Sequence, residues 1–161
     1  INSIKNVKLV RKACSNSNGT VEFHSGHHHK SSLLKENAGY KGYEVKTFKV
    51  ESCTLDSEIS INNYPKPLLI KIDIEGGGIY ALPGMYDTID KHRPLILIES
   101  HSPEEDAAIT QVLINYDYEG FRVNNHKWIM NKRSNYTDKE GVWGTILLVP
   151  NEKKDEIDRI I

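Results

Sequence analysis

The stretch Leu68-Leu69-Ile70-Lys71-Ile72-Asp73-Ile74-Glu75 decides the fold class of this 161-residue chain. Its first five residues form a nearly continuous apolar run, and Leu95-Ile96-Leu97-Ile98 forms a second one. Continuous rather than alternating apolar runs are typical of central strands that are covered by helices on both faces. Residues 73–94 are enough for a crossover helix, so we expect two adjacent parallel strands with a right-handed connection. The sequence therefore predicts an α/β domain.

A helix is predicted directly after the second apolar run. Ser102-Pro103-Glu104-Glu105 offers an N-cap serine, a proline in the first turn and a capping-box glutamate. Apolar residues then recur at positions i, i+3, i+4 and i+7, namely Ile109, Val112, Leu113 and Tyr116. This spacing is that of the buried face of an amphipathic helix.

Shorter segments on both sides of this block carry strand-forming residues. The predicted strands lie within residues 7–10, 21–23, 43–55, 121–123, 127–130 and 144–149. Residues 24–42 are polar and follow neither a helical nor a strand period, which predicts a long surface loop. Residues 56–65 are predicted as a polar linker, and residues 152–161 as a short charged helix.

Composition and charge exclude several classes of function. With 38% hydrophobic residues, the chain can bury the core of one domain. Its 21 lysines and arginines against 22 acidic residues leave a net charge of −1, so no general field attracts nucleic acid or an acidic membrane. No apolar run approaches the roughly 18 residues that span a bilayer. Cys14 and Cys53 lack a disulfide-rich pattern, which favours free thiols and a cytoplasmic protein.

Titratable side chains gather where the two apolar runs end. Asp73 and Glu75 follow the first run, and Glu99 and His101 follow the second. Ligands of open parallel sheets bind beyond the carboxyl ends of the strands, so we expect these four side chains on one rim. The three glycines after Glu75 permit a close approach of the backbone to a ligand. The alternative is that Asp73 and Glu99 only cap the helices that follow.

The order of the segments around these strand ends is distinctive. The central stretches are Leu69-Ile70-Lys71-Ile72-Asp73-Ile74-Glu75-Gly76, Leu82-Pro83-Gly84-Met85 and Arg93-Pro94-Leu95-Ile96-Leu97-Ile98-Glu99-Ser100-His101. Upstream stand Ala13-Cys14-Ser15, Gly19-Thr20-Val21-Glu22-Phe23, Ser31-Ser32-Leu33 and Thr54-Leu55-Asp56. In order and approximate spacing, residues 7–149 resemble the FkbM-type methyltransferases.

This resemblance implies a fold, a cofactor and a reaction. The fold is an α/β, doubly wound, mostly parallel Rossmann-like methyltransferase sheet with an antiparallel C-terminal hairpin. The methyl donor is S-adenosyl-L-methionine, and the acceptor is a hydroxyl group of a sugar, lipid or secondary metabolite. Partners are thus a small-molecule or glycan acceptor, with neither nucleic acid nor a membrane span.

The resemblance also implies roles for particular residues. Cofactor-binding positions would be Ala13, Cys14, Ser15, Asp73, Glu75 and Gly76. The first three would lie near the adenine and Asp73 near the methionine end of the donor, whereas Glu75 also faces the acceptor. Catalytic positions would be Asp73, Glu99 and His101, with no metal. We expect His101 to be the general base, because its unperturbed pKa lies near neutrality, and Asp73 to be the reserve.

Two departures from the family pattern shape the expectations. Gly78 stands where members usually have an acidic residue, and no glycine-rich loop follows a first strand. Such a loop, together with an acidic residue after the second strand, would hold half of the donor. We therefore expect residues 1–161 to be a partial methyltransferase domain, truncated N-terminally. The sheet would then be completed by a missing N-terminal segment, by an oligomer partner, or by closing up of its own strands.

Two other classes of function remain open. A non-catalytic binding or interaction module on a degenerate methyltransferase scaffold is favoured by Gly78 and by the absent loop. A weaker alternative is a hydrolase that uses a metal bound by Asp73 and Glu99. The histidines of the polar loop, His24, His27, His28 and His29, allow three readings: a solvated loop, adventitious metal binding, or contact with the acceptor.

Overall fold

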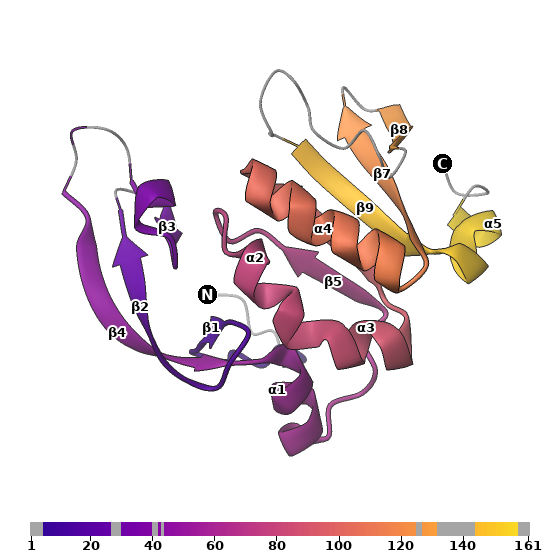
Figure 1. The fold of residues 1–161 in the computed structure, drawn as a ribbon. Coiled ribbons are helices and arrows are strands. Elements are labelled where there is room, and N and C mark those ends of the chain that lie inside the picture. The colour runs from indigo at the N-terminus through magenta and orange to yellow at the C-terminus, as the bar shows by residue number, and fades with distance from the viewer. Residues whose placement is uncertain are drawn as a thin grey trace.

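The computed structural model contains two β-sheets and a layer of helices (Figure 1). It describes residues 5–26, 30–39, 42, 44–124, 127–131 and 144–157. One sheet has the strand order β1-β4-β2-β3, and the other has the order β5-β6-β9-β7-β8. The strands are β1 (Ala13–Cys14), β2 (Gly19–Ser25), β3 (Ser31–Ser32), β4 (Lys46–Cys53), β5 (Leu69–Ile72), β6 (Leu95–Ser100), β7 (Tyr118–Asn124), β8 (Lys127–Asn131) and β9 (Gly144–Pro150).

The helices come mainly from the middle of the chain. The α-helices are α1 (Leu55–Asn62), α2 (Gly78–Ala81), α3 (Tyr86–His92), α4 (Pro103–Asn115) and α5 (Lys154–Ile157). Short 3-10 turns are η1 (Lys35–Asn37), η2 (Pro83–Met85) and η3 (Asn151–Lys153). None of these helices, within the described residues, is long and apolar enough to cross a bilayer.

The expected parallel pair is confirmed. β5 pairs with β6 in parallel, from Leu69 opposite Leu95 to Ile72 opposite Ile98. The chain between them forms α2, η2 and α3, which supply the crossover. Both strands therefore point their carboxyl ends to the same edge of the larger sheet.

The core lies between the larger sheet and its helices. Along β6, buried residues alternate with half-buried ones, and Ile96, Ile98 and Ser100 face inward. The predicted helix is confirmed as α4: its apolar residues Ile109, Val112 and Leu113 are fully buried. In Figure 1, α4 crosses the strands beside α2 and α3. Burial of each large apolar side chain contributes roughly 1.5–3 kcal/mol, so this layer anchors the strand ends.

The expectation of a doubly wound, mostly parallel sheet is met only at the coarser level of a mixed α/β fold. Among the described strands, β1–β4 and β5–β6 are parallel, and every other pair is antiparallel. Two residues of β6 that face away from the helices are apolar for another reason. There Leu95 and Leu97 pack against a small cluster of Phe121, Leu147 and Val149 from neighbouring strands. Within the described part of the chain, contacts between neighbouring strands thus bury this face of β6.

The C-terminal region largely follows the prediction. β7 pairs with β8 and with β9, antiparallel in both cases, which confirms the hairpin. β9 also runs antiparallel to β6. The predicted terminal helix begins with η3 and α5, and residues beyond 157 lie outside the described part of the chain.

Three expectations for the N-terminal half are corrected. Residues 7–10 do not form a strand; the first strand of the described residues is β1, which pairs in parallel with β4. The predicted linker is the helix α1, whose N-cap Thr54 accepts a hydrogen bond from the Ser57 N–H at 3.1 Å. The apolar residues of α1 do not recur with the helical period, so the sequence pattern did not indicate a helix. The predicted polar loop contains β3, paired with β2, and η1. His27, His28 and His29 lie outside the described residues.

Candidate functional site

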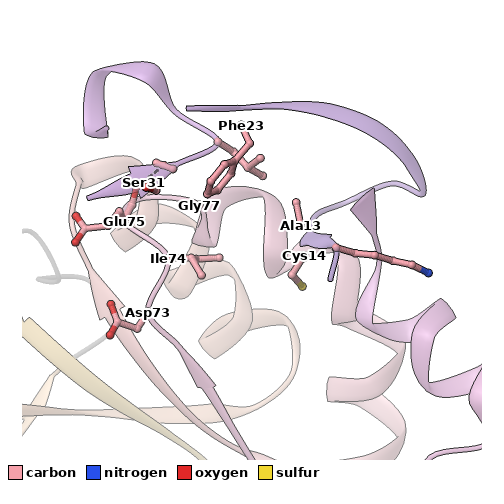
Figure 2. A pocket seen from close by; sticks show the side chains of 11 residues that line it. Ala13, Cys14, Phe23, Ser31, Asp73, Ile74, Glu75 and Gly77 are labelled. Carbon is pink, nitrogen blue, oxygen red and sulfur yellow. Dashed lines mark hydrogen bonds between the residues drawn. The ribbon is translucent and has the colours of Figure 1, made fainter. Parts of the chain in front are cut away.

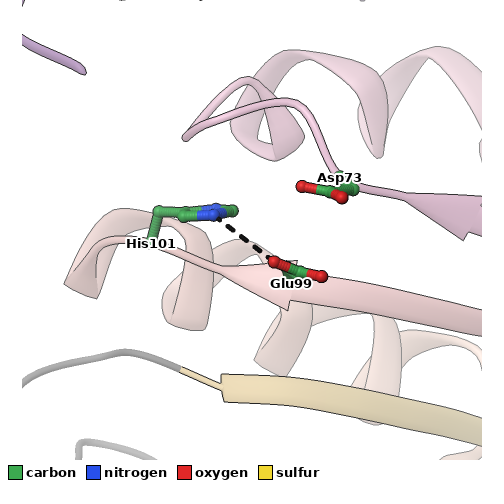
Figure 3. A group of neighbouring side chains, drawn as sticks. All are labelled: Asp73, Glu99 and His101. Carbon is green, nitrogen blue, oxygen red and sulfur yellow. Dashed lines mark ion pairs between the residues drawn. The ribbon is translucent and has the colours of Figure 1, made fainter. Parts of the chain in front are cut away.

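Three of the expected side chains come together beyond the parallel strands. Asp73 follows β5, Glu99 lies near the end of β6, and His101 follows that strand. One ligand atom from each lies within 4.8 Å of the others. Figure 3 shows the carboxylate of Asp73 and the ring of His101 on the same side of the sheet edge as Glu99. Their common position was predicted, and their chemical roles stay predictions.

The imidazole of His101 is enclosed by carboxylates. Its side chain is 8% exposed, with Nε2 3.8 Å from Glu99 Oε2 and 4.0 Å from Glu75 Oε2. On the opposite side of the ring, Nδ1 lies 3.4 Å from Glu105 Oε2. Glu105 is the main cause that raises the pKa of His101 above its ordinary value; burial opposes this effect, and Glu75 and Glu99 add to it. The ring thus gains protons more readily than a solvated histidine.

The carboxylate of Glu105 was not predicted as part of the site. Its side chain is 1% exposed. Oε1 accepts the Gly78 N–H at 2.8 Å, and Oε2 accepts the His101 N–H at 2.7 Å. The capping-box expectation is met in part, because Ser102 Oγ accepts the Glu105 N–H, while the Glu105 carboxylate reaches one residue further back. The spacing of four residues from His101 is the sequence signal that could have revealed it.

A lysine balances part of the negative charge at the strand ends. Lys71 Nζ lies 2.8 Å from Asp73 Oδ2 and 3.9 Å from Glu99 Oε1. Its hydrogen bond to Asp73 is the main cause that raises the pKa of Lys71. Carboxylate and imidazole ligands suit divalent transition metals, so Asp73, Glu99 and His101 have the composition of a metal site. Because the Lys71 ammonium already lies against two of them, we interpret the group as an ion-pair cluster.

A cavity of about 520 Å³ opens beside this cluster (Figure 2). Four of the six residues expected to bind cofactor line it, namely Ala13, Cys14, Asp73 and Glu75. The remaining lining residues are Lys12, Phe23, Ser31, Ser32, Leu33, Ile74 and Gly77. Residues of the smaller sheet and of the loop after β5 therefore form one pocket. Its size fits the range of about 300–1,000 Å³ that is usual for small-molecule sites.

The other two expected cofactor-binding residues lie beside this cavity. Ser15 is buried and lines a neighbouring cavity of about 300 Å³ together with His24 and Tyr80. Gly76 has a left-handed φ of 87°, and an added Cβ would lie 1.8 Å from Asn37 Nδ2. The glycine is thus required by its conformation and by close packing. It shapes the loop without lining the large cavity.

The loop after β5 is tied to the smaller sheet. Ser32 Oγ donates a hydrogen bond to the Glu75 carbonyl at 2.6 Å, and Asn37 Nδ2 donates to the same carbonyl at 3.1 Å. Glu75 itself has a left-handed φ of 47°, which costs strain of order 1 kcal/mol that the surrounding contacts offset. A contact of Ser31 and Ser32 with the acceptor stays a prediction, whereas the hydrogen bonds of Ser32 and Asn37 to Glu75 were not predicted, because they depend on how the loop after β5 meets the smaller sheet.

Cys14 contributes a neutral wall to the cavity. Burial is the main cause that raises the pKa of this thiol to about 11, and the neighbouring Cys53 contributes to this rise. Cys14 and Cys53 are register partners in the parallel pair β1–β4, and both are free cysteines. A thiol with this pKa is protonated at neutral pH and behaves as a small apolar group.

The fold and the site together define an α/β protein with a ligand-sized cavity beside the carboxyl end of β5, one strand of a parallel pair. The chain belongs to the FkbM methyltransferase family: the family model described as Methyltransferase FkbM domain matches residues 2–123. The resemblance inferred from the sequence is thereby confirmed. Neither the comparison with curated proteins nor the comparison with solved structures gave a match.

Proposed function

We propose that this chain is part of an S-adenosyl-L-methionine-dependent O-methyltransferase that acts on a hydroxyl group of a sugar, lipid or secondary metabolite. The observation that carries the proposal is the cavity of about 520 Å³ that Asp73 lines, since Asp73 also belongs to the cluster with Glu99 and His101. A group-transfer enzyme needs a donor site and a proton acceptor side by side, because the donor and the acceptor must be held in line.

The residues of the cavity suit the proposed donor. S-adenosyl-L-methionine supplies a methyl group on a positively charged sulfur. Asp73 and Glu75 provide negative charge at one side of the cavity, and Ala13, Cys14 and Phe23 provide apolar surface. The carboxylates are therefore suited to the sulfonium end, and the apolar residues to the adenine. Ser15 belongs beside the adenine end, next to the second cavity.

The acceptor side of the proposed site consists of His101, Glu99 and Asp73. A hydroxyl bound there would give its proton to Nε2 of His101, the ring nitrogen that faces Glu99 and Glu75. Glu99 would accept a hydrogen bond from the acceptor molecule, and Asp73 is the reserve base. Removal of a proton by a positioned side chain contributes typically ~100-fold to 10,000-fold in rate.

The proposed enzyme needs a larger sheet than the described strands form. Among these strands, β5 pairs only with β6 and is the outer strand of the larger sheet. Its residue Leu69 is 55% exposed. We infer that further strands, from another segment of the same protein or from a second chain, complete a mostly parallel, doubly wound sheet at this edge. The free thiols Cys14 and Cys53 support a cytoplasmic location.

A methyl-transfer assay on the whole natural protein tests the proposal. Asp73→Asn and His101→Gln should each lower transfer by ~100-fold or more. Because the His101 side chain is buried, His101→Gln should also cost roughly 1–3 kcal/mol of stability. Asp87→Asn, an exposed carboxylate paired with Lys91, is the control and should leave transfer unchanged.

The same assay separates the alternative of a non-catalytic binding module. That reading rests on Gly78, which stands where an acidic residue is usual in the family resemblance. If a bound small molecule protects the protein thermally but no acceptor is methylated, and if both variants bind as the unsubstituted protein does, the module reading is the correct one.

A further inference from the structure

Glu105 is a buried carboxylate with an unusually complete set of partners. It lies in the first turn of α4, 1% exposed, and it receives the backbone N–H groups of Gly78 and His101. A buried carboxylate without such partners would cost several kcal/mol. The two backbone donors come from different segments, so they fix the position of both carboxylate oxygens.

This fixed carboxylate faces one nitrogen of the imidazole. Oε2 of Glu105 lies 3.4 Å from Nδ1 of His101, whereas Nε2 lies on the side of Glu99 and Glu75. A carboxylate beside one ring nitrogen favours the tautomer that carries the hydrogen on that nitrogen. The lone pair of the neutral ring then lies on Nε2.

We propose that Glu105 is the positioning residue for His101: it holds the neutral imidazole as the Nδ1–H tautomer and presents the Nε2 lone pair to the strand-end side of the site. The proposal rests on the proposed function for the identity of the group that gives its proton to Nε2. The orientation of the ring itself is a property of the protein without substrate.

Gly78 is the second half of this arrangement. A Cβ added at Gly78 would lie 2.5 Å from Oε1 of Glu105 and 3.3 Å from the Cδ1 atom of Ile98. Position 78 is buried, so a larger residue there would displace the carboxylate. The absence of a side chain at 78 therefore leaves room for Glu105, and a carboxylate from α4 takes the space that a side chain at 78 would fill.

The sign of the pH effect follows from the charges around the ring. His101 is faced by Glu105 from α4, by Glu75 from the loop after β5, and by Glu99 from β6, with Asp73 close by. Lys71 is the cation beside Asp73 and Glu99. Because Glu105 favours the protonated ring, its neutralisation should lower the pKa of His101. The base would then be available at lower pH, but in a poorer orientation.

Nuclear magnetic resonance of the ring nitrogens tests the proposal without any assay of transfer. The probe is the His101 imidazole in the natural protein, in Glu105→Gln and in the control Glu104→Gln, which removes an exposed carboxylate one residue away. The His101→Gln variant assigns the signal. We expect Glu105→Gln to lower the pKa of His101 and to raise the fraction of the Nε2–H tautomer, while Glu104→Gln changes neither. An unchanged pKa and tautomer in Glu105→Gln would overturn the proposal.

Gly78→Ala is a second test from the opposite side of the carboxylate. It should change the tautomer and the pKa of His101 in the same direction as Glu105→Gln, and it serves if that variant does not fold. In the methyl-transfer assay, both variants should lower the maximal rate by at least ~10-fold, within the range that a general base contributes. The acid limb of the pH profile should move to lower pH, which a loss of folded protein alone would not produce. A ring that responds as expected in a protein without transfer would refute the proposed function and leave the positioning intact.

Discussion

Arg93 joins the end of α3 to the C-terminal strands through several kinds of contact. It has a left-handed φ of 52°, and its guanidinium binds both oxygens of Glu152, at 2.9 and 2.8 Å. The same group lies 4.7 Å from the ring centroid of Tyr118. A two-pronged pair of this kind has fixed geometry, which a single lysine contact would lack. The Arg93 hydrogen bond lowers the pKa of Glu152 to about 2.

This pair predicts an acid-sensitive contribution to stability. The pKa of Glu152 is lower in the folded protein than in the unfolded chain. The pair therefore stabilises the protein above the ordinary carboxyl pKa, and this effect is lost as the pH falls towards about 2. Glu152→Gln should lower the free energy of unfolding by less than ~1 kcal/mol at neutral pH, as is usual for exposed pairs. Urea unfolding of both proteins from pH 7 to pH 2.5 checks this; a difference that grows on acidification would contradict it.

Single residues also show how far the sequence determines the site. Asp73, Glu99 and His101 could be predicted because each stands directly at the end of an apolar run, and parallel strands bring such positions to one edge. The spacing of four residues signals the contact of Glu105 with His101, but its contact with Gly78 could not be predicted, because it crosses from α4 to the start of α2. The role of a glycine that makes room for a distant carboxylate is visible only when the two helices are placed side by side.

At the scale of elements, α1 and α3 are joined by one aspartate. Asp56 Oδ1 accepts hydrogen bonds from the Thr88 N–H at 2.8 Å and from Thr88 Oγ1 at 2.6 Å, and Oδ2 accepts the Asp87 N–H at 3.1 Å. These are amide groups of the first turn of α3, which have no acceptor within their own helix. Asp56 thus caps a helix other than its own.

Removal of this cap should destabilise the helical layer. We expect Asp56→Ala to lower the free energy of unfolding by roughly 1–3 kcal/mol, because the buried Thr88 hydroxyl and two amides lose their acceptor. The measurement is chemical unfolding at neutral pH. Asp87→Ala is the matched control, since it leaves the backbone donor in place and removes only an exposed side chain. An equal loss in both variants would show that general surface charge, and not the cap, sets the effect.

The elements were predicted unevenly, and the reason is physical. β6 and α4 have strong apolar patterns that match their burial, whereas β5 has an apolar run of which only Ile72 is buried. α1 has no strong apolar pattern. Its stability depends instead on the cap Thr54 at its start and on contacts with α3 and η2, which the sequence pattern does not indicate. The direction of β9 is likewise not contained in its apolar run. It follows from the β7 hairpin, which returns the chain antiparallel to β6.

At the scale of the whole molecule, the larger sheet ends in an apolar edge. Leu68 and Leu69 are 71% and 55% exposed, and β5 is the outer strand of the order that the described residues form. An exposed apolar edge strand can pair with a further strand, whether correctly or by aggregation. A further strand can therefore pair with the larger sheet at β5.

A charge at this edge should reduce self-association of the isolated chain. We expect Leu69→Lys to lower the fraction of large species in light scattering, while the free energy of unfolding changes by only ~0.5 kcal/mol. Ile61→Lys is the control, because Ile61 is also exposed but belongs to the helix α1 and not to a strand. If both substitutions reduce scattering equally, exposed apolar area in general, rather than the strand edge, drives association.

The two hydrogen bonds from Ser32 and Asn37 to the Glu75 carbonyl also bear on the order in which the molecule folds. They join segments about forty residues apart, so their formation closes a long loop, which is slow compared with the turn of a hairpin. The pairing of β2 with β4, and of β7 with β9, joins residues that are closer together in the sequence. The cavity that the smaller sheet forms with the loop after β5 should accordingly form later than these two antiparallel pairs, so a partly folded chain would have β2 paired with β4 before it has a place for a ligand.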